Sequence, residues 1–335
     1  MNITTTDYHT AGEPFRIVTG GLPPVPGDSV AERRAIAIGA GGTATSPRRS
    51  ALDDVRRLLT REPRGHAGMY GGFVVPADDG EADFGVLFWH KDGYSTACGH
   101  GTMALGAWAV DTGQVPAPED GTALVRIDVP SGRVTATVHR RGGRTTAVTF
   151  RNVPTRVLAR KVELATSRGP VAVDLAHSGA VYASLPAGAL GLAVAPEQLP
   201  ELTAAGREIR AALEEHPELA EYRDGVYGVI LYDELPDTPA GPHQRNVTVF
   251  ADGQIDRSPC GSGTSARLAL LADEGTLRPE QTLRHDSIIG TVFTGRVREQ
   301  RPDGAITEVT GSAHRTGEHR FVLDSDDTLG AGFLL

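Results

Sequence analysis

Two cysteine-containing segments of the chain closely resemble each other, and they constrain its fold more than any other feature. Residues 98–113 read CGHGTMALGAWAVDTG, and residues 260–275 read CGSGTSARLALLADEG. Aligned without gaps, the segments are identical at eight of sixteen positions, and a phenylalanine, Phe88 or Phe250, stands ten residues before each cysteine. Nearly half of the 335-residue chain separates the copies. We interpret this pattern as an internal duplication, which predicts two similar domains.

Each copy predicts a strand, a tight turn that carries the cysteine, and a helix that ends before a glycine, Gly113 or Gly275. The predicted domains cover residues 1–155 and 156–317. A capped helix is expected over 50–61, a helical stretch within 196–216, and a loop over 233–242. Together with short apolar runs, these elements predict a strand-rich α/β (α+β) chain. The expected strands are 15–19, 72–75, 85–89, 124–129, 133–139, 145–150, 227–232, 246–250, 290–297, 306–309 and 320–323.

Composition excludes several classes of protein. The net charge of −9 argues against nucleic acid or an anionic membrane as the main partner. With only two cysteines, neither a disulfide framework nor a four-cysteine zinc site is possible. The first residues show no basic region followed by an apolar run, and no apolar run reaches membrane-spanning length. We therefore expect a cytoplasmic protein, and no spacing in the sequence predicts a metal site.

The start of a helix is a chemically active place for a cysteine. Its first N–H groups lack helical partners and carry the positive end of the helix dipole, so they favour a thiolate with a lowered pKa and can bind a carboxylate. The turn glycines allow a ligand to approach closely. Two such turns could hold one small anionic substrate between two thiols. One thiol would remove a proton from the carbon beside the carboxylate, and the other would return one to the opposite face, without metal or cofactor.

Three motifs carry a resemblance to a known family: DYHTAGEPFRIV (7–18), YSTACGHGTMALG (94–106) and DRSPCGSGTSA (256–266). They resemble the proline racemase family, which includes 4-hydroxyproline 2-epimerases and trans-3-hydroxy-L-proline dehydratases and works without pyridoxal phosphate. The resemblance implies the two-domain fold of the diaminopimelate epimerase type. In that fold strands wrap round a central helix in each domain, the active site lies in the interdomain cleft, and the last segment, here about 318–335, returns to the first domain.

The resemblance also implies roles for individual residues. Cys98 and Cys260 match the paired acid/base positions, and Asp256 matches the acid that holds the ring nitrogen. Tyr70 and Phe250 fall where aromatic residues flank the ring. The substrate carboxylate is expected at the backbone of Gly99, His100, Gly261 and Ser262. The partner is then a small molecule, proline or a hydroxyproline, and the enzyme is expected to need no cofactor and could form a homodimer.

The motifs point to two branches of this family. Residues 62–73, 226–231 and 245–259 resemble the dehydratase branch, whose members usually carry threonine at the position of Cys260. The cysteine pair instead matches racemases and epimerases. Because a second thiol decides whether a planar carbanion is reprotonated, we predict a racemase or epimerase that inverts Cα. Dehydration of trans-3-hydroxy-L-proline is the alternative.

Two other classes of function predict different behaviour. A cysteine hydrolase needs one nucleophile, so only one cysteine should matter. A non-catalytic amino-acid-binding protein would gain nothing from paired thiols. Two thiols facing one substrate could also form a disulfide in an empty cleft, if their Cα atoms come within about 7 Å. His9, Glu13 and His66 lie in motif-like stretches, but the sequence assigns them no chemistry.

Overall fold

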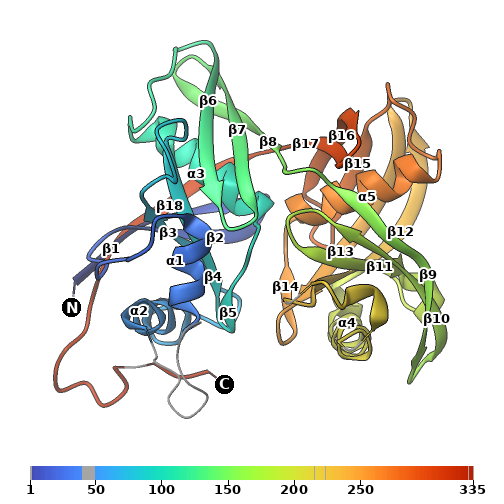
Figure 1. Cartoon of the computed structure of the whole chain (residues 1–335), viewed down its shortest axis with the longest axis horizontal. Helices are drawn as coiled ribbons and strands as arrows, with labels where there is room; N and C mark the ends of the chain where they lie inside the picture. The colour runs from blue at the N-terminus through green and yellow to red at the C-terminus, as the bar shows by residue number, and fades with distance from the viewer. Residues whose placement is uncertain (1, 40–49, 215, 223, 331, 335) are drawn as a thin grey trace. The chain divides into compact units, whose positions relative to one another are not determined.

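The computed structural model describes residues 2–39, 50–214, 216–222, 224–330 and 332–334 (Figure 1). Contacts between Cα atoms divide the chain into two compact units. Unit 1 comprises Met1–Thr10, Pro14–Val148 and Ala313–Leu335, and unit 2 comprises Ala11–Glu13 and Thr149–Ser312. Within the described ranges, no helix combines the length and apolar character needed to cross a membrane.

Unit 1 is built mainly of strands, from both ends of its sequence. The N-terminal strand pairs antiparallel with β18, from Asn2 opposite Val322 to Thr10 opposite Ala313. Strand β2 pairs parallel with β3, β3 antiparallel with β4, and β4 parallel with β6, which forms a hairpin with β7. The strands are β1 (Asn2–Thr10), β2 (Glu13–Gly20), β3 (Tyr70–Val75), β4 (Phe84–His90), β5 (Gly93–Tyr94), β6 (Gly121–Val129), β7 (Gly132–Arg141) and β18 (Ala313–Val322), and β8 (Arg144–Arg151) crosses the unit boundary.

The three helices of unit 1 are α1 (Val30–Ala37), α2 (Ala51–Thr60) and α3 (Gly99–Asp111). As predicted, Ser50 caps α2, because its Oγ accepts a hydrogen bond from Asp53 N at 3.1 Å. Helix α3 begins after Cys98 and is followed by Gly113, whose φ of +72° lies in the left-handed region that favours glycine after a helix. Every residue of α3 up to Val110 is buried, so this helix lies inside unit 1 rather than on its surface.

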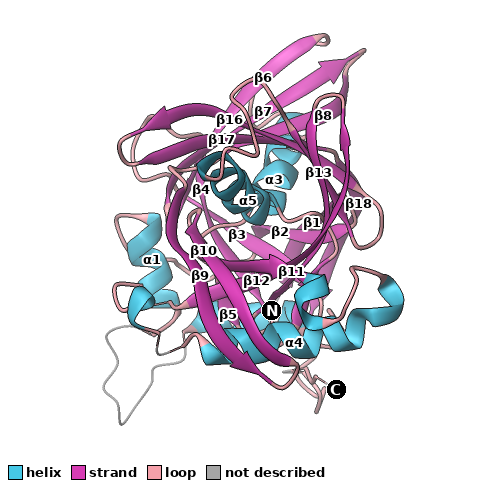
Figure 2. Ribbon diagram, turned by 90° about the vertical axis from the view of Figure 1, so that its right-hand side faces the viewer, coloured by secondary structure: helices cyan, strands magenta, loops and turns pink. Residues whose placement is uncertain are grey.

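Unit 2 repeats several of these pairings. Strand β11 pairs parallel with β12, β12 antiparallel with β13, and β13 parallel with β15, which pairs antiparallel with β16. The strands are β9 (Arg156–Thr166), β10 (Gly169–His177), β11 (Val181–Pro186), β12 (Val226–Thr238), β13 (Gly241–Phe250), β14 (Gln254–Asp256), β15 (Leu283–Ser287), β16 (Val292–Arg301) and β17 (Gly304–Gly311). Figure 2, coloured by secondary structure, shows how strongly strands predominate over helices.

The helices of unit 2 differ in burial. Helix α4 (Leu199–Ala212) buries Leu202, Ala205 and Ile209 at helical spacing, so it presents one apolar face to β12 and β13. Helix α5 (Gly261–Asp273) begins after Cys260 and is buried along its length as far as Leu271. Short 3₁₀ helices complete the unit: η1 (Ala187–Leu190), η2 (Pro196–Gln198) and η3 (Pro217–Leu219).

The predicted mixture of α and β structure is confirmed, and one local prediction is wrong. Residues 233–242 do not form a loop, because β12 extends to Thr238 and β13 begins at Gly241. Backbone pairing continues to Leu235 opposite His243, and the register shifts before Thr238. Pro236, Asp237 and Pro239 lie at this irregular end of the hairpin, where the absence of a backbone N–H donor in proline costs little.

Candidate active site

Cys98 is held by the first turn of the helix that it begins. Its Sγ accepts a hydrogen bond from Gly101 N at 3.2 Å, so the side chain caps the helix. Its carbonyl oxygen accepts from Thr102 N at 3.0 Å and from Thr102 Oγ1 at 2.8 Å. A β-carbon at Gly101 would lie 2.8 Å from this sulfur, so only glycine leaves the thiol in place. The local sequence therefore fixes both the position and the direction of the thiol.

The surroundings of Cys98 are aromatic. The imidazole of His100 approaches the sulfur, with Nδ1 at 3.4 Å and Nε2 at 3.7 Å. The ring of Tyr70 meets that of His100 edge-on, with centroids 4.9 Å apart, and Phe15 contacts both rings. The Tyr70 hydroxyl is hydrogen-bonded to Ser95 Oγ. Unit 1 thus brings together four predicted site residues: Tyr70, Cys98, Gly99 and His100.

Cys260 caps its helix in the same way as Cys98, but its backbone has a different conformation. Its Sγ accepts from Gly263 N at 3.3 Å, and its carbonyl accepts from Thr264 N at 2.7 Å. Its φ is +63°, in the left-handed region, whereas Cys98 is extended with φ of −158°. For a residue other than glycine this conformation costs about 1–2 kcal/mol. The neighbouring residues must therefore hold the turn.

A relay of hydrogen bonds holds the backbone around Cys260. The Asp256 carboxylate accepts from Ser258 N at 2.8 Å and from Ser258 Oγ at 2.7 Å. Ser258 Oγ in turn accepts from Cys260 N at 3.1 Å. On the other side, Asn246 Nδ2 donates to Pro259 O at 3.1 Å. The three polar side chains, those of Asp256, Ser258 and Asn246, are buried, so water competes little for these bonds.

His285 supports the first turn of α5. Its Nδ1 lies 2.8 Å from Thr264 Oγ1, and this hydroxyl is also 3.2 Å from Pro259 O. Because the hydroxyl has one proton to donate, to the carbonyl, we assign the imidazole proton to Nδ1. Nε2 then carries only a lone pair, and no partner for it exists among the described residues. Complete burial, assisted by the charge of Arg267, lowers the pKa of His285 to about 3.

The acidity predicted for helix-start cysteines is wrong for Cys260. Burial, together with the negative charge of Asp256, raises the pKa of the Cys260 thiol above its ordinary value. The hydrogen bond from Gly263 N lowers this pKa but does not compensate. Desolvation therefore outweighs the helix start, and Cys260 is a protonated thiol at neutral pH.

Two tyrosines that sequence reasoning missed connect Phe250 to Cys260. The ring of Phe250 stacks on Tyr227, with centroids 5.5 Å apart and planes at 16°. Tyr227 meets Tyr182 edge-on at 5.7 Å, and the Tyr182 hydroxyl lies 3.9 Å from Cys260 Sγ. Neither tyrosine lies in a cysteine motif, and although Tyr227 lies in segment 226–231, its place near Tyr182 follows from the pairing of β11 and β12.

Ser262, in the first turn of α5, has a buried hydroxyl. Only 1% of this residue is exposed, and its Oγ has no hydrogen-bond partner in the described part of the chain. Its carbonyl, by contrast, accepts from Ser178 Oγ at 2.8 Å. Leaving a polar group unpaired in the interior costs about 1–3 kcal/mol. Unit 2 thus gathers five predicted site residues: Phe250, Asp256, Cys260, Gly261 and Ser262.

The three motif residues without assigned chemistry lie in different environments. His9 packs against His314, with ring centroids 5.4 Å apart, and burial lowers the pKa of His9. His66 is exposed, and its Nδ1 accepts from Gly68 N at 3.1 Å. Glu13 is completely buried, and its carboxylate accepts hydrogen bonds from Arg257, close to Cys260 in the sequence.

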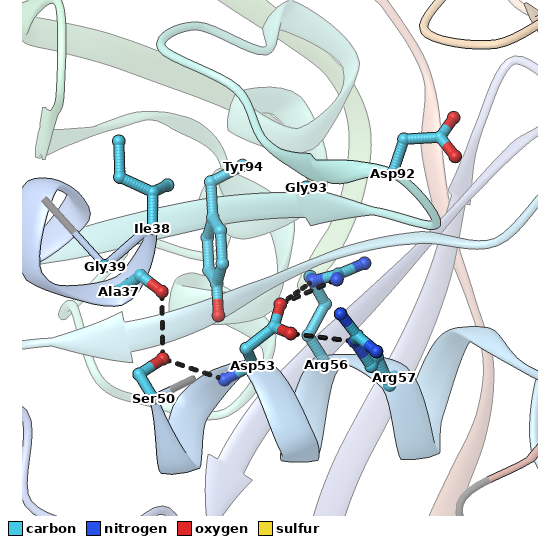
Figure 3. Close-up of a pocket in the computed structure, with 10 residues that line it drawn as sticks. All are labelled: Ala37, Ile38, Gly39, Ser50, Asp53, Arg56, Arg57, Asp92, Gly93 and Tyr94. Carbon is cyan, nitrogen blue, oxygen red and sulfur yellow. Dashed lines mark hydrogen bonds and ion pairs between the residues drawn. The ribbon is translucent and has the colours of Figure 1, made fainter. Parts of the chain in front are cut away.

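A cavity of about 480 Å³ lies elsewhere in unit 1, and its lining includes neither cysteine (Figure 3). Three of its charged groups are paired with one another: Asp53 accepts from Arg56 and Arg57, at 2.8 Å in each case. None of the predicted site residues lines it. Over the described ranges, no three His, Cys, Asp or Glu side chains gather as metal ligands.

The family model for proline racemase matches residues 5–334. This chain belongs to the proline racemase family. Trans-3-hydroxy-L-proline dehydratase of Bacillus thuringiensis is 40% identical over 343 residues, covering 99% of this chain and 98% of that relative. The 3-hydroxyproline 2-epimerase of Burkholderia multivorans is also 40% identical, over 346 residues, with 100% and 98% covered.

A solved proline racemase-type structure has the same fold. The hydroxyproline epimerase of Agrobacterium vitis, with bound trans-4-hydroxy-L-proline, matches with a TM-score of 0.89 and 30% identity, covering 100% of this chain and 95% of that one. The predicted family is therefore confirmed, and the protein is an enzyme of the proline racemase family. The names of its relatives include both an isomerase and a lyase.

Proposed function

We propose that this enzyme inverts Cα of proline or a hydroxyproline, with Cys98 and Cys260 as its acid/base pair. One observation carries the proposal: a cysteine caps the start of a buried helix in each unit, with Sγ 3.2 or 3.3 Å from a backbone N–H. Core packing alone gives no reason for two such thiols. Inversion requires that each thiol reach one face of the same carbon.

The two thiols are chemically unequal, which suits the two roles. Cys98 lies beside an imidazole, a group that can exchange a proton with it. Cys260 is a thiol whose pKa is raised by burial, so it is ready to donate a proton. In one direction Cys98 removes the Cα proton as a thiolate, and Cys260 gives its proton to the opposite face. The roles then exchange for the reverse reaction.

The starts of α3 and α5 supply the remaining chemistry. Their backbone N–H groups can bind the substrate carboxylate and stabilise the negative charge that spreads onto it when the Cα proton leaves. The Ser262 hydroxyl, which is unpaired among the described residues, supports this assignment, because a bound carboxylate would accept its hydrogen bond. Asp256 is proposed to hold the ring amine, and Tyr70 and Phe250 to flank the ring. No step of this mechanism needs a metal or an organic cofactor.

Dehydration of trans-3-hydroxy-L-proline is the second candidate, favoured by the relative from Bacillus thuringiensis that carries this name. Here Cys98 would remove the Cα proton, and the 3-hydroxyl would leave with a proton as water. A ring with a carbon–carbon double bond would remain, and it would tautomerise to the ketimine. Cys260 as a proton donor could protonate either the leaving hydroxyl or Cα, so its presence allows both reactions.

The deciding experiment is incubation of the purified enzyme in D₂O with L-proline, trans-4-hydroxy-L-proline and trans-3-hydroxy-L-proline in turn. We expect inverted product that carries one deuterium at Cα, measured by chiral chromatography and mass spectrometry. A ketimine formed from the 3-hydroxy substrate, without inversion of any substrate, would instead establish the dehydratase.

Replacing either thiol tests the pair itself. We expect Cys98→Ser and Cys260→Ser each to slow inversion at least about 100-fold, because an alcohol is a much weaker acid than a thiol. The two single variants serve as controls for each other, since a hydrolase-like mechanism needs only one of them. Inversion at the full rate in Cys260→Ser would refute the assignment.

A further inference from the structure

Glu13 is an acidic side chain buried beside the turn that carries Cys260. None of its side-chain surface is exposed. Its carboxylate accepts three hydrogen bonds from one residue: from Arg257 N at 2.8 Å, Nε at 2.7 Å and a terminal guanidinium nitrogen at 3.0 Å. Burying a carboxylate is costly unless the bonds it makes are good, and these three bonds involve both the backbone and the side chain of Arg257.

Arg257 lies between two groups of the proposed site. It follows Asp256 directly, and Ser258 comes next, linking the Asp256 carboxylate to Cys260 N. The bond from Arg257 N to Glu13 therefore fixes the backbone at the start of this relay. A shift of Arg257 would move both the Asp256 carboxylate and the strained backbone of Cys260.

The segment that carries Glu13 is itself attached to unit 2. Ala11 N donates to Ser312 O at 3.2 Å, and Ala11 O accepts from Thr291 Oγ1 at 2.7 Å. Gly12 packs so closely on Ile289 that a β-carbon would meet its side chain. Residues 11–13 accordingly belong to unit 2, although their sequence neighbours on both sides belong to unit 1. The backbone that carries Glu13 is thus held in place by contacts within unit 2.

We propose that Glu13 is a positioning residue that, through Arg257, fixes the place of Asp256 and of the Cys260 thiol. The expected effect of Glu13 on catalysis rests on the proposed function, whereas its expected effect on the position of Cys260 does not. A displacement of about 1 Å of a reacting group can slow a reaction about 100-fold. The left-handed backbone of Cys260 makes such a displacement easy once the anchor is lost, because relaxation releases strain.

The chain offers a closely matched control in unit 1. Asp128 also accepts a backbone hydrogen bond, from Asp78 N at 2.9 Å, and two from the guanidinium of Arg133. The arginine side chain is 27% exposed in both pairs, and both carboxylates are buried. Glu13→Gln and Asp128→Asn therefore remove the same kind of interaction from two different places.

The test compares alkylation of the two cysteines by iodoacetamide in the full-length enzyme, followed by mass spectrometry. In Glu13→Gln we expect Cys260 to react at least about five-fold faster relative to Cys98, because a freed turn exposes a thiol that is now 6% exposed and lowers its pKa. Asp128→Asn should leave the ratio of the Cys260 and Cys98 alkylation rates unchanged. Glu13→Asp, which keeps the carboxyl group, should restore part of the protection. An unchanged ratio in Glu13→Gln would overturn the proposal.

Catalysis provides a second measurement. If the enzyme inverts proline or a hydroxyproline, kcat/KM should fall at least about ten-fold in Glu13→Gln and less than two-fold in Asp128→Asn. If the wild-type enzyme inverts no substrate, the proposed function fails, and the alkylation ratio still decides the role of Glu13. Should Glu13→Gln not fold, Arg257→Gln removes the guanidinium bonds but keeps the backbone bond, and it must raise the same ratio for the proposal to stand.

Discussion

Removing the imidazole of His285 should make the protein less sensitive to acid. In the folded protein burial lowers the pKa of this group to about 3, against 6.5 in an exposed state. Between these values the unfolded chain binds a proton that the folded chain does not, so the free energy of unfolding falls as the pH falls. Lowering the pH from 8 to 5 should reduce the free energy of unfolding by about 2 kcal/mol through this group alone. The reason is that protonation at pH 5 stabilises the unfolded chain, where the pKa is 6.5, by that amount.

The measurement is the free energy of unfolding in urea at several pH values between 5 and 8, for the wild type and for His285→Asn. Asparagine keeps a donor near Thr264 Oγ1, and His285→Gln provides a second neutral side chain. Both variants should be less stable than the wild type at pH 8 because of the cavity they leave. The difference in the free energy of unfolding between wild type and variant should become smaller by about 2 kcal/mol at pH 5. A difference in stability that stays constant, or that grows as the pH is lowered, would refute a buried, neutral imidazole.

Two further substitutions test local features. Gly101→Ala should push the thiol of Cys98 aside, which should slow turnover at least about ten-fold and lower the free energy of unfolding by about 1–3 kcal/mol. Gly188→Ala is the control, because its β-carbon meets open space, and it should change turnover and stability little. Equal effects of the two substitutions in activity and denaturation assays would contradict the predicted clash at Gly101. Ser50→Ala should lower the free energy of unfolding by about 1 kcal/mol through loss of the α2 cap, and full stability in the same denaturation assay would show the cap to be dispensable.

The local features of the cysteine turns could be predicted from the sequence because they depend on residues close together in the chain. Cysteine, two glycines and threonine within five residues produce the cap of α3 and of α5, with Sγ bonded to Gly101 N or Gly263 N. The glycine after each helix likewise follows from the need for a positive φ at that point.

The environment of Cys260 could not be predicted in the same way. Its acidity depends on burial, and the residues that surround or support it, such as Tyr182 and His285, come from other strands, outside the cysteine motif. The same holds for the Glu13–Arg257 pair, whose members are 244 residues apart. Strand β9 is also absent from the predicted strands, because Val162 and Leu164 are its only buried residues and the apolar alternation is weak.

The left-handed backbone at position 260 also limits how this site can change during evolution. A side chain branched at the β-carbon is more crowded than cysteine at a φ of +63°, so threonine at this position adds to the strain of the turn. Exchange of the sulfur for a branched alcohol therefore favours a different path for the main chain between strand β14 and helix α5. A replacement of Cys260 by threonine should accordingly be tolerated better together with changes in the residues that hold this turn.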